Sequence, residues 1–468
     1  MGNFNDLKSK LTALLADVNV DYAEIRTEDS RDLSIAYIGT QLERVRRNDF
    51  IGGNVRALHR GGWGFVSFND IAELETSLQL ACEQARAAGA IVNEESMLAA
   101  VPTVVDDVTP RWNMHPEKVS LDEKIKILGQ YHKQILSYDD IPAAYAVLRE
   151  RCTTLVFANS EGSCIRQEKV DFSFAVGAEG KRGDVSVDQS VSDGSSDGIS
   201  KLFGRENEID EMCKRTQKLL GAPVITAGVY TTICDPELTG LFIHEAFGHL
   251  SEADDLVNDP DFLKAMTMGR VLGRPILNIY DTGDVATGRG YMVYDEEGVA
   301  CTRADLVKEG VLVGRLNNRW SSAKLGEPVT GSSRALDFNF PPIVRMRNTC
   351  IEGGSSTFED MIKDVKLGVY ALGTGGGGET NGEMFNFGAD YGYIIRDGKL
   401  CELVRDVKLM GNVFTTMENI DMIGNDACGQ DSTGGCGKSE QSPLPTSNVC
   451  PHIRIQNVVI GGVQDDDE

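Results

Sequence analysis

Residues 235–250 read DPELTGLFIHEAFGHL and contain the chain's most informative cluster of side chains. Asp235 followed by Pro236 is a strong helix start, because aspartate caps the first turn and proline needs no hydrogen-bond acceptor there. His244, Glu245 and His249 follow within the predicted helix, although the whole chain has only six histidines. Two imidazoles and one carboxylate could supply most of a catalytic zinc site.

The spacing of the two histidines is unusual for a pair of metal ligands on one helix. The common zinc-protease pattern H-E-x-x-H separates them by four residues, whereas His244 and His249 are five apart. On a regular α-helix, positions five apart lie about 140° from each other, so both rings could not reach one metal ion. We therefore expect a local π-type widening, which Gly248 would make easier. The alternative is a regular helix with one buried and one exposed histidine.

A catalytic zinc site usually needs a third protein ligand, which must come from elsewhere in the chain. Cys436 lies in the run Gly434-Gly435-Cys436-Gly437-Lys438, where glycines allow close approach and Lys438 could favour the thiolate. The residues themselves leave three competitors in the same region, Cys428, Cys450 and His452.

Glu252, Asp254 and Asp255 follow directly after His249. They could orient a ligand imidazole through its second nitrogen. We favour the other interpretation, in which they form the solvated end of the helix.

Around this helix the chain divides into helix–strand units and a glycine-rich remainder, which predicts an α+β protein. Periodicity predicts helices over 4–18, 70–88, 120–137 and 205–220, and strands over 141–158, 163–177 and 184–192. Short strands are expected at Tyr22–Ile25, Leu33–Tyr37, Val55–Leu58 and Trp63–Phe68, and Pro102, Pro110 and Pro116 mark a linker. The predicted domains are an N-terminal region 1–222, with units at about 1–90 and 118–222, and a mainly β C-terminal domain 223–468 that carries the helix with His244, Glu245 and His249. The acidic end Asp465–Glu468 is expected to fray.

Composition narrows the class of protein. The chain has 468 residues, with 46 Lys and Arg against 71 Asp and Glu, for a net charge of −25. Such acidity argues against binding to nucleic acid or anionic membranes, and Arg44, Arg46 and Arg47 form too small a basic cluster to change this. The start has no signal-peptide pattern, and the uncharged stretch Leu219–Cys234 falls short of the roughly 20 apolar residues that span a bilayer. Eleven cysteines without a C-x-x-C pair indicate reduced thiols, so we expect a soluble cytoplasmic protein.

Two further patterns carry weaker signals. Gly373–Gly378 matches G-x-G-x-x-G, but the following sequence predicts turn and strand instead of the helix that a dinucleotide loop requires. A bare backbone ledge that pairs with an extended peptide, or a plain flexible loop, fits better. His59, His115 and His132 lack ligand spacing and are expected to be structural.

The motif GLFIHEAFGHLSEADD, together with YDEEG, WSSAKLGEPVTGSSR, GYIIRDGKL, the CGK loop and the final VVIGG, resembles the TldD/PmbA family. These are metallopeptidases also labelled modulators of DNA gyrase. The resemblance covers most of 223–463 and is greatest to the TldD branch, which carries H-E-x-x-x-H. After Cys-Gly-Lys the family often has a residue and then Gly-Gln, whereas this chain has Ser439-Glu440-Gln441.

The resemblance implies that His244, His249 and Cys436 bind Zn²⁺ and that Glu245 is the general base. It also implies short or unfolded peptide substrates and a dimer, formed by two copies or with a metal-free family member. We therefore expect a zinc-dependent peptidase. The alternatives are a non-catalytic binding or scaffolding subunit of such a complex, and a metal hydrolase that acts on a non-peptide amide.

Overall fold

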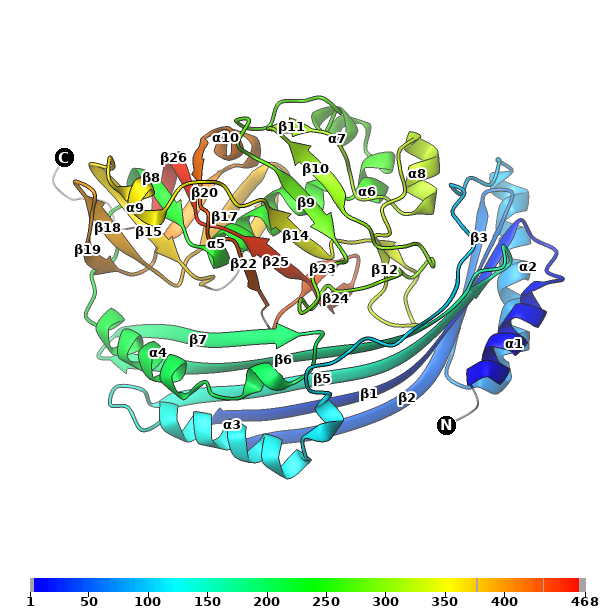
Figure 1. The fold of residues 1–468 in the computed structure, drawn as a ribbon, viewed down its shortest axis with the longest axis horizontal. Helices are drawn as coiled ribbons and strands as arrows, with labels where there is room; N and C mark the ends of the chain where they lie inside the picture. The colour runs from blue at the N-terminus through cyan, green and yellow to red at the C-terminus, as the bar shows by residue number, and fades with distance from the viewer. Residues whose placement is uncertain (1–3, 376–377, 432, 463–468) are drawn as a thin grey trace.

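The chain folds into a long curved sheet with a second domain seated on the sheet's concave face (Figure 1). The computed structural model describes residues 4–375, 378–431 and 433–462. The predicted frayed end, Asp465–Glu468, lies outside these residues. The α+β class predicted from the sequence is confirmed.

The curved sheet has seven strands, of which β1, β2, β5 and β6 are long. Its order is β3-β2-β1-β5-β6-β4, with β7 also paired to β6, and only β4 runs parallel to its neighbour. The strands are β1 (Tyr22–Gly39), β2 (Gln41–His59), β3 (Gly62–Phe68), β4 (Val105–Val108), β5 (Ala143–Asn159), β6 (Cys164–Arg182) and β7 (Val185–Ser195).

The prediction of several short strands near the N-terminus is wrong, because Tyr22–Ile25 and Leu33–Tyr37 are parts of the single strand β1. The polar residues between them keep the period of two. Ile25 and Ile35 pack into hydrophobic cores on one face, whereas Arg26 and Glu28 point to the other face and pair with each other at 3.1 Å. Polar side chains that find partners on the concave face therefore do not interrupt the strand.

The predicted linker contains a strand. β4 lies between Pro102 and Pro110 and pairs in parallel with the start of β6. In addition, β1 pairs with β5 over sixteen residue pairs, from Glu24–Asn159 to Gly39–Ala144. The strands of the two expected N-terminal units therefore belong to one sheet, whereas the domain boundary near 222 stays a prediction.

An edge of this sheet is left open along half of β2. β3 pairs only with Gly53–His59, and among the described residues no strand pairs with 41–52 on that side. The side chains from Gln41 to Asp49 are exposed.

Four helices cover the convex face of the sheet. The helices predicted near 4–18, 70–88, 120–137 and 205–220 are confirmed as α1 (Phe4–Leu15), α2 (Leu74–Val92), α3 (Leu121–Ile135) and α4 (Glu206–Leu219). Ser120 caps α3 by accepting a hydrogen bond from the Glu123 amide. No helix of the described residues is long and apolar enough to cross a membrane.

The C-terminal half forms two further sheets that enclose one hydrophobic core. The nine-stranded sheet has the order β16-β17-β20-β26-β8-β15-β18-β19, with β21 also on β26, and the six-stranded sheet has the order β11-β10-β9-β14-β25-β22. Two small hairpins, β12–β13 and β23–β24, complete the strands. The bounds are β8 (Gly228–Cys234), β9 (Ile279–Thr282), β10 (Ala304–Lys308), β11 (Val311–Leu312), β12 (Ser333–Arg334), β13 (Ile343–Val344), β14 (Asn348–Ile351), β15 (Leu367–Leu372), β16 (Gly378–Asn381), β17 (Met384–Gly388), β18 (Tyr391–Arg396), β19 (Lys399–Val404), β20 (Lys408–Asn412), β21 (Ile420–Ile423), β22 (Cys428–Gln430), β23 (Cys436–Lys438), β24 (Gln441–Leu444), β25 (Ser447–Cys450) and β26 (Ile453–Gly461).

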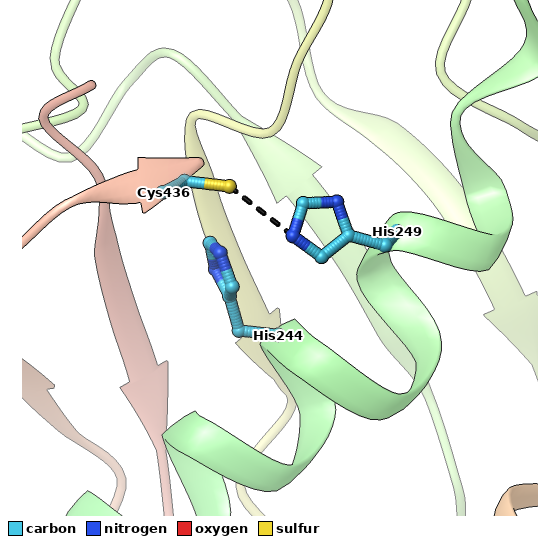
Figure 2. A group of neighbouring side chains, drawn as sticks. All are labelled: His244, His249 and Cys436. Atoms are coloured by element: carbon cyan, nitrogen blue, oxygen red, sulfur yellow. Dashed lines mark hydrogen bonds between the residues drawn. The ribbon is translucent and has the colours of Figure 1, made fainter. Parts of the chain in front are cut away.

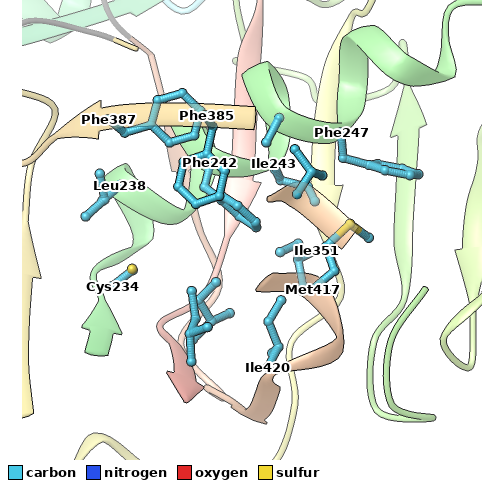
Figure 3. Packing of buried hydrophobic residues seen from close by; sticks show 14 of the residues in the cluster. Cys234, Leu238, Phe242, Ile243, Phe247, Ile351, Phe385, Phe387, Met417 and Ile420 are labelled. Atoms are coloured by element: carbon cyan, nitrogen blue, oxygen red, sulfur yellow. The ribbon is translucent and has the colours of Figure 1, made fainter. Parts of the chain in front are cut away.

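The helix that carries the histidines passes through this core. Phe242 packs against Phe385 and Phe387 of the larger sheet, with ring centroids 5.3 and 6.3 Å away (Figure 3). Ile243 and Phe247 are fully buried in the same cluster. The remaining helices are short: α5 (Pro236–Leu241), α6 (Ala253–Asn258), α7 (Pro260–Ala265), α8 (Arg319–Leu325), α9 (Phe358–Ile362) and α10 (Val413–Glu418).

Buried ion pairs join the curved sheet to the C-terminal domain. Arg56 of β2 donates to Glu24 at 2.7 Å and to Glu297 of the C-terminal domain at 2.8 Å. Arg26 of β1 pairs with Glu296 at 3.2 Å. Because these groups are almost fully buried, each charge depends on its partner for stabilisation.

Replacement of Arg56 by alanine should destabilise the protein by about 3–5 kcal/mol, because two buried carboxylates would lose their common partner. The shift is measured as a lower midpoint of denaturant unfolding. Arg47→Ala, on the exposed part of the same strand, is the matched control and should change little. Equal shifts for the two variants would contradict a role of the buried pairs.

Candidate metal centre

The helix that begins at Asp235 changes its winding before it reaches the second histidine. The Asp235 carboxylate accepts a hydrogen bond from the Leu238 amide at 2.8 Å, which starts α5. The chain then forms a π-helix over Phe242–Gly248, in which the His249 amide donates to the His244 carbonyl five residues earlier. The predicted π-type widening is thus confirmed.

The widening brings both imidazoles to the same side, where they meet Cys436 (Figure 2). The ring centroids of His244 and His249 are 5.5 Å apart, and Cys436 Sγ lies 3.3 Å from His249 Nε2. One donor atom from each of the three residues lies within 4.8 Å of the others. Of the described residues, only these three form such a group of histidine, cysteine or acidic side chains.

The competing third donors are placed elsewhere. His452 contacts Tyr370 at 2.9 Å and Asp426 at 2.6 Å through its two ring nitrogens. Cys428 and Cys450 face each other across β22 and β25 as free thiols.

Gly248 contributes space instead of an unusual backbone conformation. Its φ of −58° is that of an ordinary helix. A Cβ atom at this position would lie 2.0 Å from Met346 Sδ, so any larger residue would require the buried Met346 side chain to move.

Cys436 begins a short hairpin formed by β23 and β24. Ser439 and Glu440 form its two-residue turn with φ of +49° and +66°, the conformation that such turns require. Glu440 stands where the resemblance described above often places glycine, and the turn is nevertheless formed. Gly435 is needed for close approach, because a Cβ there would lie 2.6 Å from the Leu444 carbonyl oxygen.

The interpretation of the acids after His249 as a solvated helix end is wrong for Glu252. Its side chain is fully buried, and it contacts His249 Nδ1 at 3.0 Å and accepts a hydrogen bond from the Met346 amide at 3.2 Å. The prediction failed because the segment that buries this residue lies more than ninety positions later in the chain. The prediction is also wrong for Asp254, whose side chain is 14% exposed and accepts a hydrogen bond from the Val344 amide at 2.9 Å. Asp255, in contrast, has a side chain that is 63% exposed.

Lys438 forms ion pairs with these acids instead of with the Cys436 thiolate. Its ammonium group lies 3.2 Å from Glu252, 2.7 Å from Asp254 and 3.0 Å from Asp255. The lysine therefore ties the strand that carries Cys436 to the segment that follows His249. The sequence offered one signal for this contact, the clustering of three acids next to the histidine.

The electrostatics of the three clustered residues favour a thiolate beside imidazolium rings. Burial disfavours the thiolate, but contact with His244 and His249 outweighs burial and lowers the pKa of Cys436 to about 5. Burial disfavours the charged ring of His249, yet Cys436 and Glu252 raise its pKa to about 11. Burial would raise the pKa of Glu252, whereas Lys438 and His249 lower it to about 2.

A cleft of about 770 Å³ opens over His244, Glu245 and Cys436. It lies between β7 and α4 on one side and the C-terminal domain on the other, and its walls are rich in carboxylates. Burial raises the pKa of both Asp235 and Asp390 to about 7, with further contributions from the charge of Glu237. Glu245 is half-buried in the cleft, with a carboxylate oxygen 3.7 Å from His249 Nε2.

The other predicted features lie outside this group of three. The loop Gly373–Gly378 follows β15 and leads into strand β16 instead of a helix, as the sequence predicted, and this context excludes a dinucleotide loop. Gly376 and Gly377 lie outside the described residues. Gly373 and Thr374 line the cleft. His59 faces Asp21 at 3.2 Å, His115 packs on Trp112 and His132 contacts the Gly39 carbonyl, which agrees with structural roles.

The cluster fits a zinc ion by its chemistry. Two imidazoles and a thiolate are a donor set that zinc accepts in catalytic sites. His244 is 5% exposed, and its Nδ1 has no hydrogen-bond partner among the described residues. A buried ring nitrogen without a partner is costly unless a ligand or water satisfies it.

Comparison with protein families matches the chain in three consecutive segments. The description "PmbA/TldA metallopeptidase domain 1" applies to residues 23–89, "central domain" of the same family to 115–220, and "C-terminal domain" to 227–462. The last segment contains His244, Glu245, His249 and Cys436.

Relatives match over nearly their whole length. A metalloprotease from Synechocystis is 39% identical over 446 residues, covering 94% of this chain and 95% of that protein. A metalloprotease from Methanothermobacter thermautotrophicus is 32% identical, covering 97% and 98%. A protein named zinc metalloprotease TldD homolog, from Saccharolobus solfataricus, is 27% identical, covering 88% and 90%.

Solved structures share the fold. A protein from Thermotoga maritima described as a modulator of a DNA gyrase superposes with a TM-score of 0.80 at 18% identity, covering 98% of this chain and 100% of that one. TldE from Thermococcus kodakarensis gives a TM-score of 0.75 at 17% identity with the same coverage.

In the metal-free protein, Cys436 should remain a thiolate at neutral pH. Its ultraviolet thiolate absorbance should disappear as the pH falls through about 5, because the histidines lower its pKa. Burial raises the pKa of Cys234 and Cys450, so these thiols do not contribute at neutral pH. Cys436→Ser is the control and should lack the step; a step in the wild type only near the ordinary thiol pKa of about 8.5 would contradict the prediction.

Proposed function

Because the chain belongs to the TldD/PmbA family, we propose that it is a zinc-dependent peptidase that hydrolyses peptide bonds in short or unfolded peptides. The observation that carries the proposal is the convergence of His244, His249 and Cys436 beside a cleft that is lined by His244, Glu245 and Cys436. The names of the relatives, metalloprotease and zinc metalloprotease, support the same class of activity.

In this proposal His244, His249 and Cys436 hold the ion. Zinc bound there supplies Lewis acidity, which makes water a better nucleophile near neutral pH and polarises a carbonyl group. The low pKa of the Cys436 thiol supports its role, because only the thiolate binds metal well. The thiolate also offsets part of the positive charge in a buried site.

Glu245 is the general base of the proposed reaction. Its half-buried carboxylate lines the cleft next to the three clustered residues, within reach of a water or substrate that enters there. It would accept a proton from the attacking water and deliver it to the leaving amine as the peptide bond breaks.

Glu252 and Lys438 act as positioning residues. Glu252 binds Nδ1 of His249 and so leaves Nε2 directed toward Cys436. A carboxylate in this position fixes the tautomer and orientation of a ligand imidazole. Lys438 fixes the carboxylate in turn and is itself only two residues from Cys436.

The depth of the site supports extended substrates. Cys436 is 2% and His244 5% exposed, so a peptide bond can reach them only if the chain around it enters the cleft. A folded protein cannot present its backbone in this way.

We propose that the protein works in the cytoplasm as a dimer, with a second copy or with a metal-free family member, and binds neither nucleic acid nor membranes.

Glu245→Gln should lower the rate of peptide hydrolysis by roughly 10²- to 10⁴-fold, the usual effect of losing a general base, while zinc content stays at that of the wild type. The measurement is cleavage of a random-coil peptide mixture, with metal analysis of the same samples. Chelation of the wild type should abolish cleavage, and His244→Ala should lose the metal. Equal activity of the wild type and Glu245→Gln would remove Glu245 from the mechanism. A stable wild type that binds no zinc would favour a scaffolding subunit. A zinc-loaded wild type that cleaves no peptide would favour a non-peptide amide as substrate.

Glu252→Ala should weaken zinc binding by roughly 10- to 100-fold, since His249 would lose the group that orients it. Competition with a chromogenic chelator measures the affinity. Asp255→Ala is the matched control, because Asp255 binds the same lysine from an exposed position. Unchanged affinity in Glu252→Ala, or an equal loss in both variants, would contradict the positioning role.

A further inference from the structure

A second cavity, of about 440 Å³, lies between the concave face of the curved sheet and the C-terminal domain. β1, β2 and β5 form one wall, and Leu336, Asp337, Thr433, Pro443 and Pro445 belong to the other. Its volume is in the range of ligand-binding pockets in proteins.

Three arginines on neighbouring strands point into this cavity. Ser34 of β1 pairs with Arg46 of β2 on one side and with Arg149 of β5 on the other, so the side chains of these three residues share one face of the sheet. Arg44 is two residues from Arg46 and lies on the same face. We call Arg44, Arg46 and Arg149 the arginine array.

The arginine array carries positive charge that the protein leaves unpaired. Elsewhere in the cavity Arg151 binds Asp32 with two hydrogen bonds of 2.9 Å, and Arg289 binds Asp171. Within the described part of the chain, no member of the array forms an ion pair, and all three are exposed.

The array's own polar surroundings do not neutralise it. Arg46 donates only to the neutral side chain of Asn48, at 3.3 Å. Of the carboxylates that line the cavity, Asp32 and Asp171 are paired with Arg151 and Arg289, and Glu150 is paired with Lys124. Asp337 on the opposite wall is one carboxylate against the three arginines of the array. An excess of guanidinium groups in a chain of net charge −25 indicates a site for an anion.

The cavity is next to the proposed catalytic cleft. Thr433 lines the cavity, whereas Gly434, Gly435 and Cys436 line the cleft, so one loop separates the two spaces. The Cα atoms of Thr433 and Cys436 are at most about 11 Å apart, because three residues span no more than about 3.6 Å each. Figure 1 shows β23 and β24, which follow this loop, above the concave face of the sheet.

We propose that the arginine array binds carboxylates of the substrate peptide at a distance from the bond that is cleaved. This inference rests on the proposed peptidase function and names a class of substrate: extended peptides that carry a carboxylate several residues away from the scissile bond. The catalytic cleft is lined by eight carboxylates, Asp193, Glu208 and Glu211 among them, against the two cations of Lys201 and Arg215, so an anionic segment would be repelled there. The carboxylate therefore lies on the arginine side of the loop. It can come from a C-terminus or from Asp and Glu side chains.

Binding is tested with zinc-loaded Glu245→Gln, which holds substrate without cleaving it. Three fluorescent peptides of equal length are compared: one ending in glutamates, one ending in glutamines with a free C-terminus, and the latter with an amidated C-terminus. We expect the glutamate peptide to bind roughly 3- to 10-fold more tightly than the amidated peptide, with a preference that shrinks at high salt. The free-ended peptide reports how much of the preference a C-terminal carboxylate supplies.

When Arg46→Gln and Arg149→Gln are added to Glu245→Gln, the protein should lose its preference for the glutamate peptide. Arg47→Gln is the matched control, because Arg47 is an exposed neighbour on the opposite face of the same strand, and this variant should keep the preference. A preference that survives the double substitution would overturn the proposal. So would a change in the mass of the assembly in the double variant, since the array would then be a contact between subunits.

The two proposals fail separately. If the wild type cleaves no peptide but the double substitution still removes the binding preference, the carboxylate site is supported and the peptidase function is rejected. Cleavage of all three peptides with equal kcat/KM by the wild type would keep the peptidase and reject the carboxylate site.

Discussion

The site depends on one backbone hydrogen bond, from the His249 amide to the His244 carbonyl. A regular α-helix would place these residues on nearly opposite sides, and no rotation of the side chains could bring both rings to one ion. A π-helix is less stable than regular α-helical winding, and the burial of Phe242, Ile243 and Phe247 in the core compensates for this difference. Burial of the apolar side of the segment thus maintains the geometry of the polar side.

The surroundings reinforce this geometry from two distant parts of the chain. Glu252 and Lys438 link the turn after His249 to the strand of Cys436, and Met346 occupies the space that Gly248 leaves. The curved sheet closes the cleft from the other side and is tied to the C-terminal domain by Arg26 and Arg56. The histidine segment therefore lies where three layers meet, which explains why so much of the chain is needed to present three side chains.

The sequence allowed the α+β class, most helix positions and the widened turn to be predicted, because each has a local signal: Asp235 before Pro236, the periodicity of α1 to α4, and the five-residue spacing. The features that it did not reveal depend on contacts between distant segments. Glu252 lies in an acidic stretch that is typical of an exposed helix end, but Met346 and its neighbours bury its side chain. The polar run at the centre of β1 was interpreted as a break, whereas Glu28 and Asp32 pair with Arg26 and Arg151 on the concave face. The choice of Cys436 over Cys428 required the family resemblance, since both lie among glycines in the same region.

The open half of β2 has a consequence for how copies of this protein meet in solution. An exposed strand edge offers free amide and carbonyl groups to any other edge, which is the usual route to uncontrolled aggregation. Along 41–49 the side chains include Arg44, Arg46 and Arg47. Two identical edges approaching in antiparallel order would set arginine against arginine, a costly arrangement. The charge that marks this strand thus also protects it against stacking with itself.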